Sequence, residues 1–328
     1  MRKAFVETLT ELAARDPRIL LLTADLGYLA LEPFADTYPA RFFNMGVAEQ
    51  NMVGVATGLA EAGFIPFVYS ITPFAVLRPY EFIRNGPIQH QLPVRIVGVG
   101  GGVEYGTNGL SHYGLEDIAV MRAQPGITVI APADAGQARG AVAATWNLPG
   151  PIYYRLGKDD KAVVPGLDGR FELGKVQHLR QGSGLLMIAM GSVATEAAAA
   201  AEQLASRGVA CSLVIVASVS PAPVDELAEL LARHPVALTV EAHYRVGGVG
   251  SLVAEVIAGR DLRCRLVRCG VNSLRNGITG SQRYLHELYG LSADKLVEAA
   301  MTALRGTDSS KPDAWRTRSL RDCPPESL

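Results

Sequence analysis

Short strand-like runs alternate with helical patterns along almost the whole chain, and this alternation limits the possible fold more than any other feature. The runs are apolar, rich in β-branched residues and bounded by turn signals. They fall at residues 18–23, 66–70, 94–99, 151–158, 184–190, 210–216, 236–241 and 264–269. Strands that alternate with helices form mostly parallel sheets with helices on both faces. We therefore expect an α/β fold.

A polar, Gly- and Pro-containing stretch without periodicity interrupts the alternation at residues 159–178. Such a composition is typical of a linker. The sequence therefore predicts two α/β domains, at residues 1–158 and 179–305, and 328 residues are enough for two domains of common size. Residues 306–328 are polar and contain prolines, so we expect a disordered tail.

The composition argues against several classes of partner. With 19% charged residues and a formal net charge of −1, the chain has no basic excess that would suggest nucleic acid or a membrane surface. The first residues resemble an amphipathic helix with acidic side chains rather than a targeting segment, and no run is as long as a membrane span. A cytoplasmic protein is expected. The four cysteines form no C-x-x-C pair, so neither a disulfide nor a cysteine metal site is predicted: Cys211, Cys264, Cys269 and Cys323.

Residues 41–60 place an acid at the start of a small, apolar helix. Gly46 permits a tight turn, and Glu49 falls in the first helical turn. A carboxylate there commonly does no more than complement the helix dipole. However, the string Asn44-x-Gly46-x-Ala48-Glu49-Gln50 before a Gly/Ala-rich helix resembles the pyrimidine-binding domain of the transketolase family of thiamine diphosphate enzymes.

This resemblance implies a catalytic role for Glu49. In the family, the Glu of this motif hydrogen-bonds N1′ of the cofactor's aminopyrimidine ring and thereby promotes removal of the proton from C2 of the thiazolium. The difficult chemistry then belongs to the cofactor, and the protein binds and orients it. We therefore predict that Glu49 binds and activates thiamine diphosphate.

A histidine forms the centre of a second motif. A single His is usually structural, but Gly109-x-Ser111-His112, continued by residues 115–118 and 125–134, resembles the family motif whose His contacts the substrate oxygen. Imidazole suits proton transfer because its unperturbed pKa is near neutral. The resemblance therefore implies that His112 binds substrate and assists catalysis.

Four further positions acquire candidate roles from the resemblance. Asp25 follows the first strand; it is either a turn residue or, as in the family, lies beside the cofactor and the subunit contact. Phe74 is either a core residue or the aromatic that stacks on the pyrimidine, as in a relative that makes deoxyxylulose phosphate. Arg78, on the same predicted helix, is a second cofactor-binding candidate. Arg155 is either a surface residue or the arginine that holds a sugar phosphate.

The glycine-rich loop 100–109 departs from the transketolase pattern at two positions. Gly100 stands where transketolases carry a His, twelve residues before the motif His, and Asn108 stands where they carry an Asp. That Asp recognises a hydroxyl next to the reacting carbon. Asn108 can still hydrogen-bond a substrate but offers no charge. The substrates could therefore differ from the common pentose phosphates.

The resemblance covers residues 1 to about 305, with the second domain similar to the C-terminal domain of transketolases. The family binds its magnesium diphosphate through a Gly-Asp-Gly motif on a separate domain, and this sequence contains no Gly-Asp-Gly. The resemblance therefore implies a partner chain that carries the diphosphate-binding domain and the Mg²⁺ ligands. We expect a heterotetramer in which two copies of this chain form a homodimer with two copies of the partner.

The resemblance predicts a subunit of a split transketolase that moves a two-carbon ketol unit between ketose and aldose sugars or their phosphates. One alternative is an enzyme that acts on a 2-oxo acid with the same cofactor, like deoxyxylulose-phosphate synthase or an oxo-acid dehydrogenase β chain. The other is a scaffold protein without cofactor. Glu49, Phe74 and His112 occur together, which argues against the scaffold.

Overall fold

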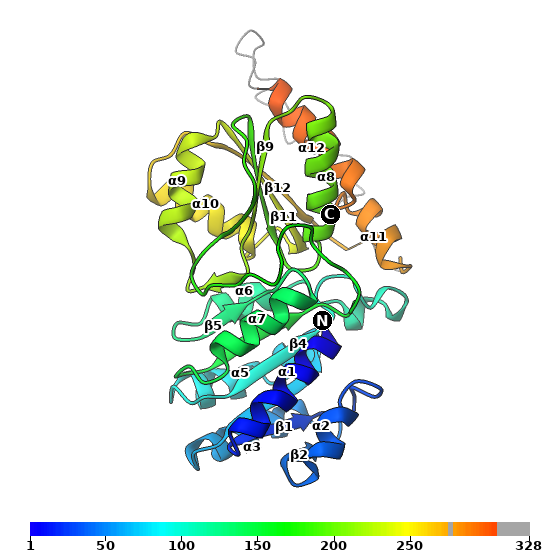
Figure 1. Ribbon diagram of the computed structural model, residues 1–328, viewed down its shortest axis with the longest axis vertical. Helices are drawn as coiled ribbons and strands as arrows, with labels where there is room; N and C mark the ends of the chain where they lie inside the picture. The colour runs from blue at the N-terminus through cyan, green and yellow to red at the C-terminus, as the bar shows by residue number, and fades with distance from the viewer. Residues whose placement is uncertain (275–277, 307–328) are drawn as a thin grey trace, which may run out of the picture.

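The computed structural model describes residues 1–274 and 278–306. The predicted disordered tail lies outside the described residues except for Gly306, which caps the last helix. Cys323 also lies outside them. The described part of the chain forms two stacked α/β halves, with the N-terminal half at the bottom of Figure 1 and the C-terminal half at the top.

The N-terminal half is built on a seven-stranded sheet in the order β10-β5-β6-β4-β3-β1-β2. All neighbours are parallel except β10, which is antiparallel to β5. Its strands are β1 (Ile19–Thr23), β2 (Phe42–Asn44), β3 (Ile65–Ile71), β4 (Arg95–Val99), β5 (Thr128–Ile130), β6 (Ile152–Leu156) and β10 (Ser218–Ser220). The strands β1, β4 and β6 are buried along their full length, as expected for a parallel sheet covered on both faces.

Helices cover both faces of this sheet. Apolar side chains of α1 (Arg2–Arg15), α2 (Glu32–Thr37) and α7 (Ala135–Thr145) form one core with one face. Those of α3 (Glu49–Glu61), α4 (Thr72–Val76), α5 (Tyr80–Ile83) and α6 (Asp117–Arg122) pack on the other. Short 3₁₀ turns occur at Pro39–Arg41, Gly106–Asn108 and Leu110–His112, and a π-helical turn at Arg84–Ile88.

The C-terminal half has a five-stranded sheet in the order β12-β11-β8-β9-β7, in which only β7 is antiparallel to its neighbour. Its strands are β7 (Gln177–Arg180), β8 (Leu185–Met190), β9 (Cys211–Ile215), β11 (Val236–Tyr244) and β12 (Arg265–Val271). The helices α8 (Ala194–Ser206), α11 (Gln282–Leu288) and α12 (Ala293–Arg305) lie on one side, and α9 (Val224–Arg233) and α10 (Val249–Gly259) on the other (Figure 1).

The α/β prediction is confirmed by these two mostly parallel sheets. One local prediction was wrong: the helix predicted to carry both Phe74 and Arg78 is divided by a turn at residues 77–79 into α4 and α5. Pro79 lacks a backbone N–H and so cannot continue an α-helical ladder. The short strand β10 was not predicted: it follows the linker in sequence but completes the first sheet, so the linker separates the two sheets less cleanly than expected.

The two halves share buried contacts. Apolar side chains of α3 and α6 belong to the same core cluster as those of α9 and α10. His243 on β11 accepts a hydrogen bond from the backbone N–H of Ala119 on α6 through Nε2, 3.3 Å away, and donates from Nδ1 to the carbonyl of Tyr244. The halves are therefore joined by a polar contact as well as by apolar packing.

No helix within residues 1–274 and 278–306 is long and apolar enough to cross a bilayer. The three described cysteines, Cys211, Cys264 and Cys269, are free and buried.

Candidate functional site

The candidate residues follow the carboxyl ends of parallel strands in the first sheet. Asp25 comes after β1, Asn44 ends β2, and Phe74 comes after β3. The glycine-rich loop with His112 follows β4, and Lys158 follows β6. Parallel strands present these ends at one edge of a sheet, where ligands of open α/β sheets bind. The topology therefore gathers residues from five separate segments at that edge.

Asn44 builds the turn that leads to Glu49. Its side-chain oxygen accepts hydrogen bonds from the backbone N–H groups of Asp25 and Gly46, and its amide donates to the Asp25 carboxylate at 2.9 Å. Gly46 has a φ of +69°, in the left-handed region that favours glycine. The helix α3 then begins directly at Glu49. The Asn-x-Gly spacing thus has a local structural reason: it turns the chain from β2 into α3.

Glu49 is a buried carboxylate with two polar neighbours. Its side chain is only 2% exposed. Ser70 at the end of β3 donates a hydrogen bond to Oε1 at 3.2 Å, and Nη1 of Arg78 lies 3.0 and 2.9 Å from the two carboxylate oxygens. An open cavity of about 330 Å³ is lined by Glu49, Arg78 and residues 47, 48 and 50. Glu49 therefore lies at the inner end of a space that opens to solvent.

Five side chains form a continuous series of cation–ring and ring–ring contacts, in which the rings meet edge-on or tilted, and we call this series the ring stack: Arg78, Phe74, His112, Tyr105 and Lys158. The Arg78 guanidinium carbon is 3.9 Å from the Phe74 ring centroid. The Phe74 and His112 centroids are 5.1 Å apart, and those of His112 and Tyr105 are 5.7 Å apart. The Lys158 ammonium is 4.6 Å from the Tyr105 centroid. These separations are typical of aromatic and cation–π contacts.

The ring stack brings together residues that are far apart in sequence. Glu49, Phe74, Arg78 and His112 were all predicted to belong to one site, and the geometry connects them through direct contacts. Ser111 contributes a hydrogen-bonding hydroxyl 3.0 Å from Nδ1 of His112. The half-buried imidazole thus has a polar neighbour on one side and an aromatic ring on each of two others.

Tyr105 and Lys158 were not among the predicted site residues. Lys158 lies only three residues after Arg155, beyond the end of β6, and its position after the strand's carboxyl end was the signal that could have identified it. The position of the Tyr105 ring requires a glycine at residue 100, because a Cβ on Gly100 would lie 2.2 Å from Cε2 of Tyr105. The tyrosine ring thus fills the space that a side chain at position 100 would need, and burial raises its pKa.

Arg155 lies inside the protein rather than at the surface of the site. Its Nε is 2.8 Å from the carboxylate of Asp117, and its Nη2 donates to the carbonyls of Gly114 and Ala242, each at 2.8 Å. Tyr153 donates to the same Asp117 oxygen at 2.7 Å. Arg155 and Asp117 are almost completely buried. A contact between Arg155 and a substrate phosphate would require this ion pair to open.

Two other predicted residues lie at the surface. Asp25 is exposed, with a φ of +54°, and accepts hydrogen bonds from Asn44 and from the Tyr28 hydroxyl, which lower its pKa. Its observed contacts are those of a turn residue that supports the Asn44 turn. Asn108 is exposed in the 3₁₀ turn between Tyr105 and His112. Its side chain is thus available to a ligand that reaches the loop.

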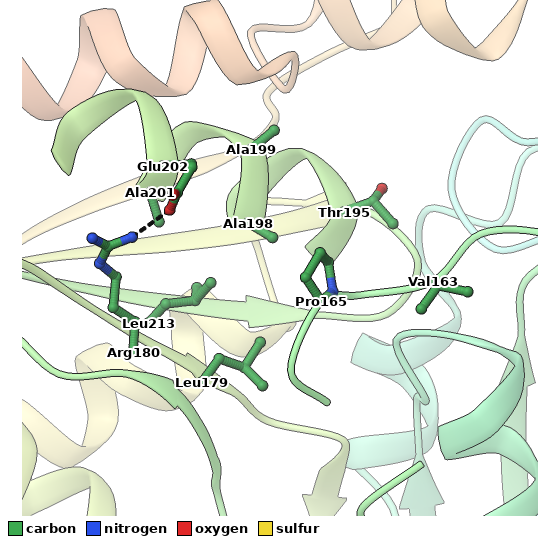
Figure 2. Close-up of a pocket in the computed structure, with 10 residues that line it drawn as sticks. All are labelled: Val163, Pro165, Leu179, Arg180, Thr195, Ala198, Ala199, Ala201, Glu202 and Leu213. Carbon is green, nitrogen blue, oxygen red and sulfur yellow. Dashed lines mark hydrogen bonds and ion pairs between the residues drawn. The ribbon is translucent and has the colours of Figure 1, made fainter. Parts of the chain in front are cut away.

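A larger cavity of about 610 Å³ lies in the C-terminal half, between the linker and α8 (Figure 2). It is bounded by Val163 and Pro165 of the linker, by the alanine-rich side of α8, and by the ion pair between Arg180 and Glu202. No residue of the ring stack lines it. Its size alone does not make it the catalytic site, and the buried carboxylate of Glu49 favours the smaller cavity.

Two family models match the chain in sequence order. The transketolase pyrimidine-binding domain matches residues 1–161, and the transketolase C-terminal domain matches residues 174–296.

Similar proteins include both separate subunits and longer chains. The chain is 38% identical over 309 residues to a putative transketolase C-terminal section of Methanocaldococcus jannaschii, covering 93% of this chain and 96% of that protein. It is 34% identical over 305 residues to one subunit of the apulose-4-phosphate transketolase of Phocaeicola vulgatus, covering 92% and 96%. It is also 34% identical to a 1-deoxy-D-xylulose-5-phosphate synthase of Syntrophotalea carbinolica, but it spans only 49% of that protein.

One solved structure has the same fold over nearly the whole chain. A split-gene transketolase, described as an inactive β4 tetramer, superposes with a TM-score of 0.84 at 37% sequence identity, covering 93% of this chain and 98% of that one.

Proposed function

This chain belongs to the transketolase family, and from that premise we propose that it is the pyrimidine-binding subunit of a two-subunit transketolase. The enzyme transfers a two-carbon ketol unit from a ketose to an aldose with thiamine diphosphate. The observation that carries this proposal is the series of contacts beside Glu49, because it connects a buried carboxylate to a half-buried imidazole through the Arg78 guanidinium and the Phe74 ring.

The residues at the Glu49 end fit the aminopyrimidine ring of thiamine diphosphate. A planar cation, the Arg78 guanidinium, already contacts both the Glu49 carboxylate and the Phe74 face, so both partners accept a flat group with N–H donors. When bound, the cofactor supplies the nucleophilic carbon that carries the ketol unit. Glu49 would share a hydrogen-bonded proton with N1′, with Ser70 supporting its carboxylate, and Phe74 would stack on the ring.

The other end of the ring stack suits the substrate. His112 would hold or move a proton at the substrate oxygen, and exposed Asn108 would hydrogen-bond a hydroxyl. We assign the contact with an anionic substrate group to Lys158 instead of Arg155. The half-buried Lys158 ammonium lies over the Tyr105 ring, whereas the buried Arg155 is paired with Asp117.

The Mg²⁺ and diphosphate contacts are assigned to a partner chain. Within the part of the chain that the structure describes, no group of three His, Cys, Asp or Glu side chains could hold a metal ion. The sequence also lacks Gly-Asp-Gly. We therefore propose a diphosphate-binding subunit as the partner, in a heterotetramer with two copies of each chain and with a homodimer of this chain inside it.

The similarity to deoxyxylulose-phosphate synthase keeps a second donor class open, a 2-oxo acid. The reconstituted pair of subunits should be tested with a ketose phosphate and with pyruvate as donor, against the same aldose phosphate acceptor. The proposal predicts transfer from the ketose without release of CO₂. Product formed only from pyruvate, with one CO₂ per turnover, would support the synthase instead.

A further inference from the structure

We propose that Arg78 occupies the binding position of the cofactor's pyrimidine ring in the free chain and must leave it before thiamine diphosphate can bind. This inference rests on the proposed function and changes the role predicted for Arg78 from cofactor contact to displaceable occupant. It concerns three side chains, Glu49, Phe74 and Arg78.

Arg78 contacts both groups that the ring needs. Its Nη1 lies 3.0 and 2.9 Å from the two oxygens of Glu49, and its guanidinium carbon lies 3.9 Å above the centre of Phe74. The carboxylate is the proposed partner of N1′, and the aromatic face is the proposed stacking surface. A guanidinium and an aminopyrimidine, both flat and both N–H donors, cannot occupy this position together.

The surroundings of Arg78 allow it to move. Its Cα lies in the turn at residues 77–79 between α4 and α5, so no helical ladder depends on its side chain. The side chain is 44% exposed and borders the open cavity of about 330 Å³. The carboxylate of Glu49, by contrast, is buried at the first residue of α3 and cannot follow.

The cost of burying a carboxylate explains why Arg78 would occupy this position in the free chain. A buried carboxylate without a partner is costly, whereas a charge-assisted hydrogen bond satisfies it. Arg78 therefore provides a partner for Glu49 until the ring arrives. A ligand that must displace another group binds more weakly: its apparent dissociation constant is the intrinsic one divided by the fraction of molecules in which the binding position is free.

The sign of the effect separates the two roles of Arg78. If Arg78 held the cofactor, its removal would weaken binding. If Arg78 occupies this position, its removal should tighten binding, by up to about 5-fold for a partly exposed ion pair worth up to ~1 kcal/mol.

The experiment compares Arg78→Gln and Arg78→Lys with the wild type, each assembled with the diphosphate-binding subunit. The matched control is Arg84→Gln, an exposed arginine on the next helical turn that hydrogen-bonds Asn85 rather than Glu49. Calorimetric titration with thiamine diphosphate and Mg²⁺ gives the dissociation constant. We expect tighter binding for Arg78→Gln, an intermediate value for Arg78→Lys, and a wild-type value for Arg84→Gln.

A second measurement uses the free chain without cofactor. Thermal unfolding of Glu49→Gln, Arg78→Gln and the double variant forms a double-mutant cycle. The proposal predicts that the double variant loses less stability than the two single losses added together.

The outcomes distinguish this inference from the proposed function. Unchanged or weaker cofactor binding in Arg78→Gln, with normal binding in the wild type, would overturn the displacement and leave the function standing. Strictly additive stability losses would also overturn it, because the ion pair would then not form in solution. If no protein, wild type included, bound thiamine diphosphate in the assembled state, the function and the displacement would both fall.

Discussion

Glu49 combines burial with a fixed position at the start of α3, and this combination makes it the most informative residue to change. Glu49→Gln keeps the size and can still accept a hydrogen bond from Ser70, but it removes the acidic group. We expect turnover in the assembled enzyme to fall by about 10²- to 10⁴-fold, as is typical for an acid–base group. The measurement is exchange of the cofactor's C2 proton, followed by NMR.

The fold should survive this change, which far-ultraviolet circular dichroism of the free chain would verify. Near-normal C2 exchange in an assembled Glu49→Gln enzyme would remove Glu49 from the catalytic role.

Lys158 and Arg155 are three residues apart, and the structure predicts different consequences for removing each. Lys158→Ala should raise KM for a phosphorylated substrate by about 10-fold or more with little change in stability, because a charge-assisted contact is lost from a half-buried side chain. Arg155→Ala should instead destabilise the fold by about 3–5 kcal/mol, because Asp117 would be left as an unpaired buried charge.

Steady-state kinetics and urea unfolding of both variants separate these effects. A stable Arg155→Ala protein whose only defect is a raised KM would show that Arg155 binds the substrate phosphate, and would contradict the assignment of that contact to Lys158.

Part of the site could be predicted from sequence because its motifs are local. One turn and the helix start that follows it are formed by Asn44, Gly46 and Glu49. The spacing of these residues in the sequence therefore predicts their relative positions. The position of Arg155 could not be inferred in this way, because its partner Asp117 lies 38 residues away and its burial depends on packing of the C-terminal half. Tyr105 was missed because its contact with Gly100 depends on how the loop folds back.

At the scale of elements, the buried parallel strands were the most predictable features. Continuous apolar runs gave β1, β3 and β4 within one residue of their observed ends, whereas β6 ends two residues before the predicted position 158. The strands β2, β5, β7 and β10 are three or four residues long, too short for a periodic signal. Pairing of β10 with β5 joins residues some 90 positions apart, and no local pattern specifies such a contact.

The start of α10 depends on a carboxylate from the neighbouring strand. Glu241 on β11 accepts hydrogen bonds from the backbone N–H groups of Val249 and Gly250, at 2.7 and 2.9 Å. Glu241→Ala would leave these two donors unsatisfied in the interior, at about 1–3 kcal/mol each. We expect amide protons at the start of α10 to exchange much faster with solvent, which hydrogen–deuterium exchange would measure. Unchanged protection there would show that Glu241 does not hold the helix start.

At the scale of the whole molecule, His243, which lies at the contact between the two halves, should make the folded chain less stable as the pH falls. Burial lowers the pKa of His243 from 6.5 to about 4, so between these values the unfolded chain binds a proton that the folded chain excludes. The stability due to neutral His243 is therefore complete above pH 6.5 and is lost as the pH falls towards 4. The expected loss is roughly 3 kcal/mol.

The test compares urea unfolding of the wild type and His243→Asn from pH 7 to pH 4. The asparagine amide does not titrate, and its N–H₂ group can replace Nδ1 of His243 as the donor to Tyr244. Burial raises the pKa of Glu241 to about 7, which has the opposite effect, but Glu241 is present in both proteins and its effect largely cancels in the difference. Equal pH dependence in the two proteins would exclude His243 as the acid-sensitive group.

The central claim is that this chain carries half of a catalytic site and needs a partner for the other half. The decisive measurement is a calorimetric titration of thiamine diphosphate and Mg²⁺ into the purified chain, and into the chain mixed with a diphosphate-binding subunit, followed by a ketol-transfer assay of both samples. We expect negligible binding and no transfer for the chain alone, because the ring contacts lack the charge interactions of the magnesium diphosphate. For the mixture we expect one cofactor per copy of this chain, with transfer activity. Tight binding and full ketol transfer by the chain alone would show that the chain needs no partner.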